Sequence, residues 1–226
     1  AGALRALPDL PGPLTAPAML NVVRLGAPGA RPALLAAHGL FGSGRNLGVV
    51  ARRLADEREV LVVDMRNHGE SPHHHSHTYP EMAADLAEVV VAEGGPLDVM
   101  GHSMGGKAAM ALALMRPELV RRLLVLDIAP VAYGHTQMQQ VEAMRRVDLA
   151  TVASRREAEE QMRAEPGMAP FLLQSLDLGE RRWRLNLDAL ERHMDDVVGW
   201  PGLGGRFDGP TLFLSGEESA YVRPEH

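Results

Sequence analysis

The chain has 226 residues, a formal net charge of −6 at pH 7 and no cysteine. The acidic balance argues against nucleic acid or an anionic membrane as a partner, and the lack of cysteine excludes disulfides, thiolate metal sites and cysteine nucleophiles. No apolar run approaches the ~18 residues of a spanning helix, and the start of the printed sequence shows no signal-peptide pattern. We therefore expect a cytoplasmic globular protein without a membrane span.

Short apolar runs alternate with helical patterns through the first part of the chain. After a lead-in rich in Pro, Gly and Ala at 1–17, the run at 33–37 is continuously apolar, which is typical of a central parallel strand covered on both faces. The regular alternation predicts an α/β fold with a mostly parallel, doubly wound sheet and functional groups at the carboxyl ends of its strands. The expected strands are 19–25, 33–37, 60–63, 97–100 and 123–126, and the expected helices are 46–55, 80–92 and 107–115.

The pattern changes at 131–203, where helical spacing continues without a convincing buried strand, and a strand pattern returns at 211–214. We expect a core at 1–130, a helical cap at 131–205 and a resumed core at 206–226. Methionines recur in the expected cap and suit either an apolar substrate site or the cap's own interior. The expected cap helices are 136–147, 154–164, 168–178 and 187–198, and their methionines are Met138, Met144, Met162, Met168 and Met194.

The segment 97–107 joins an apolar strand pattern to a helix pattern through Gly101-His102-Ser103-Met104-Gly105. A G-x-S-x-G motif between strand and helix predicts a nucleophile elbow, in which a strained turn exposes the serine hydroxyl at the sheet edge. Glycines suit a turn in which neighbouring backbones leave no room for side chains. The alternative is a purely structural Gly-rich turn. We expect Ser103 to be a nucleophile.

A run of histidines at 73–77 invites a metal interpretation, because imidazole binds zinc, copper and nickel. Neighbouring residues on an exposed loop do not by themselves give convergent ligands with supporting partners. We therefore expect a polar loop and no metal.

The motifs that carry a family resemblance are His38-Gly39-Leu40-Phe41-Gly42-Ser43, Asp64-Met65-Arg66-Asn67-His68-Gly69-Glu70-Ser71-Pro72, Gly101-His102-Ser103-Met104-Gly105-Gly106-Lys107 and Asp127-Ile128-Ala129-Pro130. They resemble the α/β-hydrolase superfamily, and more narrowly its YbfF-like esterase branch. The resemblance covers about residue 34 to the end and includes 183–187 in the expected cap. It implies an α/β-hydrolase fold without a cofactor, and a serine hydrolase that cleaves ester or thioester bonds of small to medium acyl substrates through an acyl-enzyme intermediate.

Two other functions fit the same sequence. One is a hydrolase-fold binding protein that has lost catalysis, and the other is a carbon–carbon bond hydrolase that uses the same triad. The sequence specifies neither the acyl chain and leaving group nor the oligomeric state.

A serine nucleophile needs a histidine base, and a carboxylate must orient that histidine. The resemblance implies Asp127 as the triad acid, because the YbfF-like branch places its acid after the strand that follows the elbow helix. Many other α/β hydrolases use an acid after the next strand, which here is Glu217 or Glu218. Asp127 is favoured and Glu218 is the alternative acid. A purely structural role for Asp127, as a helix or loop cap, is the remaining interpretation.

The oxyanion hole of such an enzyme needs two backbone N–H groups. Met104 supplies one by its position after the serine, and the resemblance implies Leu40 for the other; the alternative is that Leu40 serves only in packing. Residues 66–68 are expected to tie the loop behind the site by hydrogen bonds.

The superfamily places its catalytic histidine after one further strand, so we expect this residue beyond His226. The C-terminal strand and helix of the fold are then missing from the printed chain. On this basis we expect 211–214 to leave a sheet edge and an apolar face uncovered, and the 226-residue chain alone to be poorly stable and nearly inactive.

Overall fold

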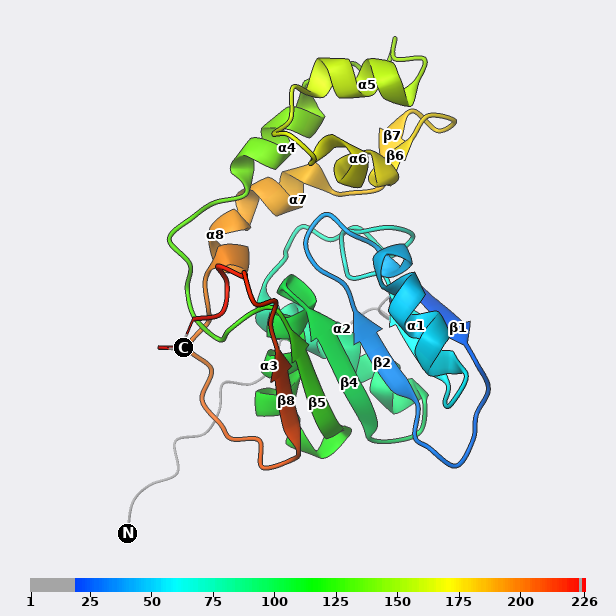
Figure 1. Ribbon diagram of the computed structural model, residues 1–226, viewed down its shortest axis with the longest axis vertical. Helices are drawn as coiled ribbons and strands as arrows, with labels where there is room; N and C mark the ends of the chain where they lie inside the picture. The colour runs from blue at the N-terminus through cyan, green and yellow to red at the C-terminus, as the bar shows by residue number, and fades with distance from the viewer. Residues whose placement is uncertain (1–18, 224) are drawn as a thin grey trace.

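The computed structural model describes residues 19–223 and 225–226 (Figure 1), and the expected lead-in at 1–17 lies outside them. Its centre is a six-stranded sheet with the strand order β1-β3-β2-β4-β5-β8. β1 runs antiparallel to β3, and the other neighbours pair in parallel, as the sequence predicts. The strands are β1 (Val22–Leu25), β2 (Leu34–Ala37), β3 (Val60–Val63), β4 (Leu97–His102), β5 (Val120–Leu126) and β8 (Thr211–Leu214).

Helices cover both faces of this sheet, because alternate residues of its central strands point to opposite sides. Leu34, Ala36, Val60 and Val62 pack with Ala51 of the helix on one face. Their neighbours along β2 and β3 pack in the larger cluster on the other face, with side chains of two further helices. The elements are η1 (Gly44–Leu47), α1 (Gly48–Ala55), α2 (Tyr79–Ala92), α3 (Met104–Met115) and η2 (Pro117–Leu119), with α1 on one face and α2 and α3 on the other (Figure 1).

Residues 138–198 form a separate helical layer beyond the carboxyl ends of the parallel strands (Figure 1). Met144, Met162 and Met194 lie in the layer's own apolar cluster and are at most 2% exposed. These three methionines therefore fill the layer's interior. The elements are α4 (Met138–Arg145), α5 (Arg155–Met162), α6 (Ala169–Leu172), η3 (Leu173–Ser175), β6 (Leu176–Asp177), β7 (Arg182–Trp183), α7 (Leu187–Arg192) and α8 (Met194–Val198).

Two helix predictions in this layer are wrong. The expected helix at 168–178 ends early, and β6 pairs with β7 in a short hairpin. The Asp177 carboxylate closes the hairpin turn by accepting the Glu180 N–H, a local hydrogen bond that competes with helix formation. The expected helix at 187–198 is interrupted at His193, which ends α7 and precedes α8.

β8 forms one edge of the described sheet, as expected for 211–214. Its side chains Leu212, Phe213 and Leu214 are between 49% and 53% exposed.

Among the described residues, no helix combines the length and apolarity that crossing a membrane requires.

Candidate active site

Ser103 lies in a sharp turn between β4 and α3. Its backbone has φ 52° and ψ −120°, a conformation that non-glycine residues rarely adopt, and the next residue begins the helix. The Ser103 N–H donates to the Leu126 carbonyl at 3.0 Å, and the Ser103 carbonyl accepts the Lys107 N–H at 3.0 Å. The strain is thus held by bonds on both sides, which is the geometry expected of a nucleophile elbow.

The glycines of the motif are required by close backbone contacts. A Cβ at Gly105 would lie 2.5 Å from the carbonyl oxygens of Ala37 and His38, at the end of β2. A Cβ at Gly101 would overlap the Gly105 carbonyl. Backbone atoms cannot move aside as a flexible side chain can. The glycines therefore allow β2, β4 and α3 to meet directly beneath Ser103.

Asp127 follows β5 and also has a positive φ, 55°. Its N–H donates to the Leu214 carbonyl at 2.7 Å, and its carboxylate accepts the Gly216 N–H at 3.3 Å. Asp127 lines the same cavity as Ser103. Glu217 and Glu218 are exposed and are not among the residues that line this cavity. The structure thus brings Asp127, and not Glu218, to the cavity of Ser103.

A cavity of about 360 Å³ lies between the strand ends and the helical layer. The core contributes Ser103, Met104 and Asp127 to its lining. The helical layer contributes apolar side chains, namely Met168, Phe171, Val197 and Val198. Ligand cavities in proteins usually combine an apolar lining with a few polar groups in this way.

The loop after β2 presents Leu40 to this cavity. Phe41 has φ 61°, its N–H donates to His68 Nε2 at 3.2 Å, and the Gly42 N–H donates to the Gly39 carbonyl at 3.1 Å. Within the described residues, the Leu40 N–H has no hydrogen-bond partner.

Met104 is the first residue of α3, where helical N–H groups have no partner in their own helix. Both N–H groups are therefore available for an anion in the cavity.

Three buried histidines lie beneath this loop and are held neutral. His38 Nε2 accepts the Met65 N–H at 2.9 Å, and His68 Nε2 accepts the Phe41 N–H, so each ring carries its proton on Nδ1. Burial lowers the pKa of both rings. Burial and then the nearby Arg66 charge lower the pKa of His77 to about 3.

Asp64 joins several loops at the end of β3. Its carboxylate accepts the Gly44 N–H at 2.7 Å, the Glu70 N–H at 3.0 Å and the Asn21 side-chain amide at 2.9 Å. Gly69 has φ 59°, and a Cβ there would overlap this carboxylate. The Asp64 motif therefore has a structural role in this region.

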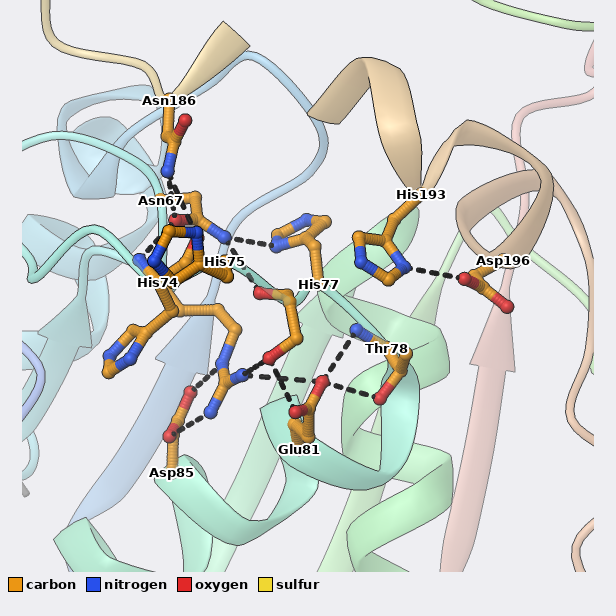
Figure 2. A network of polar contacts seen from close by, with 12 residues as sticks. Asn67, His74, His75, His77, Thr78, Glu81, Asp85, Asn186, His193 and Asp196 are labelled. Carbon is orange, nitrogen blue, oxygen red and sulfur yellow. Dashed lines mark hydrogen bonds and ion pairs between the residues drawn. The ribbon is translucent and has the colours of Figure 1, made fainter. Parts of the chain in front are cut away.

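The histidine run at 73–77 is used mainly through its backbone. The His74 N–H donates to Asn67 Oδ1 at 2.7 Å, and the His75 carbonyl accepts an Arg192 guanidinium N–H at 2.9 Å. The His77 ring accepts the Asn67 side-chain amide at 3.2 Å (Figure 2). In the described part of the chain, no group of three or more His, Cys, Asp or Glu side chains is arranged to hold a metal ion.

Lys107 also lines the cavity, which the sequence did not indicate. Its side chain is fully buried one turn after Ser103, and its ammonium donates to the carbonyls of Val198 at 3.1 Å and Gly199 at 2.5 Å. It also lies 4.6 Å from the centre of the Tyr133 ring. Burial lowers the pKa of Lys107 to about 8. Lys107 thus ties α3 to the end of α8.

None of the histidines in the described part of the chain hydrogen-bonds to the Ser103 hydroxyl. His102 is exposed, and partial desolvation lowers its pKa while the Asp127 charge acts in the opposite direction. His135 lines the cavity, with its ring 5.3 Å from that of Tyr221.

The model of the alpha/beta hydrolase family matches residues 34–225. The sn-1-specific diacylglycerol lipase ABHD11 of Mus musculus is 42% identical over 209 residues, which are 86% of this chain and 68% of that protein. Esterase YbfF of Escherichia coli K12 is 39% identical over 194 residues, or 84% of this chain and 75% of that protein.

A solved structure described as a marine microorganism esterase superposes with a TM-score of 0.86 and 32% identity, covering 92% of this chain and 84% of that one. Another ABHD11 relative, from Danio rerio, is 41% identical over 82% of this chain. The chain spans 63% of the length of that relative and 75% of the length of the Escherichia coli esterase.

Proposed function

Because the chain belongs to the alpha/beta hydrolase family, we propose that it is a cytoplasmic serine hydrolase that cleaves carboxylic ester or thioester bonds of small to medium acyl substrates. The observation that carries this proposal is the strained Ser103 elbow, which opens on the same cavity as Asp127 and Leu40, whose N–H has no partner among the described residues. Similar proteins named esterases and lipases support the same class of reaction.

The reaction begins with attack of the Ser103 hydroxyl oxygen on the acyl carbonyl carbon. A histidine takes the hydroxyl proton, and Asp127 holds that histidine in the required tautomer. The family resemblance implies that this base is a histidine that follows a later strand. The carbonyl oxygen becomes an oxyanion that accepts hydrogen bonds from Leu40 and Met104.

Collapse of this intermediate expels the alcohol or thiol, which takes the proton from the histidine. The acyl group then remains as an ester of Ser103. Water, activated by the same histidine, attacks this ester and releases the acid. A preformed oxyanion hole accelerates both halves, because both pass through an oxyanion.

We propose that the helical layer acts as the cap and selects the acyl chain. Its apolar contributions to the cavity support this role, since they face the region above Ser103. Burial of each methylene of the acyl chain against such side chains contributes about 0.8 kcal/mol. The cavity therefore favours an apolar acyl group over a charged one.

A fluorophosphonate probe tests the proposal on the natural full-length protein, because it labels only an activated serine. We expect labelling of the wild type, no labelling of Ser103→Ala, and an ester hydrolysis rate lowered by at least ~10³-fold in that variant. Circular dichroism and thermal melting should show that the variant folds. More than about a tenth of the wild-type rate in a folded Ser103→Ala protein would contradict the assignment.

The same probe, used together with p-nitrophenyl esters of different acyl chains, separates this function from the two alternatives. A binding protein without catalysis would remain unlabelled. A carbon–carbon bond hydrolase would be labelled but would not turn over p-nitrophenyl esters at rates that depend on the acyl chain.

A further inference from the structure

Phe41 is held from two directions. Its side chain packs in the apolar cluster of the helical layer and is 4% exposed, although the residue belongs to the loop after β2. Its N–H donates to His68 Nε2. These two contacts fix a residue with a positive φ directly next to Leu40. Both contacts therefore restrain the backbone on the C-terminal side of Leu40.

His68 is itself placed by the helical layer. It forms an antiparallel β-bridge with Leu185, which precedes α7. The next residue, Asn186, donates its N–H to the Asn67 carbonyl at 3.0 Å. The backbone on the N-terminal side of His68 is thus paired with a segment more than a hundred residues away.

The Asn186 side chain adds hydrogen bonds to this pairing of residues 185–186 with residues 67–68 (Figure 2). Its amide donates to Asn67 Oδ1 at 3.1 Å and to the His74 carbonyl at 3.0 Å. Its Oδ1 accepts the Ala189 N–H at 3.2 Å and caps α7. The two ends of one amide therefore have separate roles: the oxygen caps a helix, and the nitrogen binds the loop that carries His68.

We propose that Asn186 and His68 are positioning residues through which the helical layer holds the loop after β2 in the conformation that directs the Leu40 N–H into the cavity. Docking of the layer then sets the rate of the chemical step as well as the choice of acyl chain. The inference rests on the proposed function, because it assigns Leu40 to the oxyanion hole. A misaimed donor weakens the transition state more than it weakens the bound substrate.

The experiment uses Asn186→Asp and His68→Leu in the natural full-length protein. Asn186→Asp retains an oxygen to cap α7 and loses the donor to Asn67 and His74, whereas His68→Leu removes the acceptor for Phe41. Ser154→Ala is the matched control, because it removes another cap of the helical layer, on Glu157 in α5, far along the chain from this junction.

The readouts are kcat and KM for a p-nitrophenyl ester and the affinity for a trifluoromethyl ketone, which forms an oxyanion adduct with the serine. Fluorophosphonate titration counts the folded sites. For Asn186→Asp we expect kcat per site to fall at least about tenfold with KM little changed, and the ketone affinity to fall in parallel. Ser154→Ala should keep both values within about twofold.

Unchanged kcat in Asn186→Asp, or a kcat loss without a loss of ketone affinity, would overturn the inference. His68→Leu should show the same split with a larger loss; if it does not fold, Asn186→Asp alone decides. If the wild type neither reacts with fluorophosphonate nor hydrolyses the ester, the proposed function has failed instead, so the two failures are distinguishable.

Discussion

Ser103 and Asp127 occupy equivalent positions, each directly after the end of one of two neighbouring parallel strands. His102, the last residue of β4, pairs in register with Leu126, the last residue of β5. Ser103 directly follows His102, and Asp127 directly follows Leu126. Both have a positive φ, and the Ser103 N–H binds the carbonyl of Leu126. The proposed nucleophile and the proposed acid are therefore placed at neighbouring strand ends by strand register.

This placement predicts which carboxylate belongs to the triad. Asp127→Asn should lower kcat by up to ~10⁴-fold, because the amide keeps the shape but misorients the histidine. Glu218→Gln should have little effect, since Glu218 is exposed and is not part of the cavity lining. Steady-state kinetics of the two variants of the full-length protein measure the difference, and the reverse ranking would move the acid to the later loop.

The elbow predicts a large stability difference between two glycine substitutions. Gly105→Ala places a Cβ 2.5 Å from two carbonyl oxygens of the β2 end, so we expect a destabilisation of several kcal/mol or failure to fold. Gly134→Ala meets nothing within 4 Å and serves as the matched control. Urea unfolding of both variants tests this. Equal midpoints would show that the elbow can relax around a side chain.

Phe171 should limit the length of the acyl chain. It lines the cavity from the helical layer, and its replacement by Ala enlarges the space above Ser103. We expect the ratio of kcat/KM for an octanoate ester to that for an acetate ester to rise, by about fourfold for each additional methylene that becomes buried. Phe171→Leu, a smaller truncation, should give a smaller rise. No change in the ratio would place the acyl group elsewhere.

The buried histidines predict acid sensitivity above the range in which carboxylates titrate. Unfolded imidazoles bind a proton near pH 6.5, whereas burial lowers the pKa of His77 to about 3 in the folded chain. Stability from this group is therefore complete above about pH 6.5 and is lost as the pH falls toward 3, by up to ~1.4 kcal/mol per pH unit.

Urea unfolding between pH 6.5 and 4.5 measures this slope. His77→Gln should reduce this slope by about one bound proton. An equal slope in wild type and His77→Gln would mean that His77 is protonated in the folded protein.

The sequence predicts the elbow and the sheet because their signals are local. The glycines around Ser103 lie between a strand and a helix pattern, and the continuous apolarity of β2 reports burial on both faces. The pairing of Asn186 with Asn67 depends on contacts between distant segments, which no local pattern encodes. Lys107 is a similar case, since burial of a lysine depends on carbonyls supplied by α8.

The junction around Asp64 has a consequence for directed evolution. Its carboxylate serves three loops at once, and Gly69 has no room for any side chain. Most single substitutions there should prevent folding, so a screen for activity should recover few of them. Met168 and Phe171, which line the cavity, should tolerate many residues. A small library directed at the helical layer will therefore contain a far higher share of functional clones with altered substrate preference than one spread over the Asp64 motif.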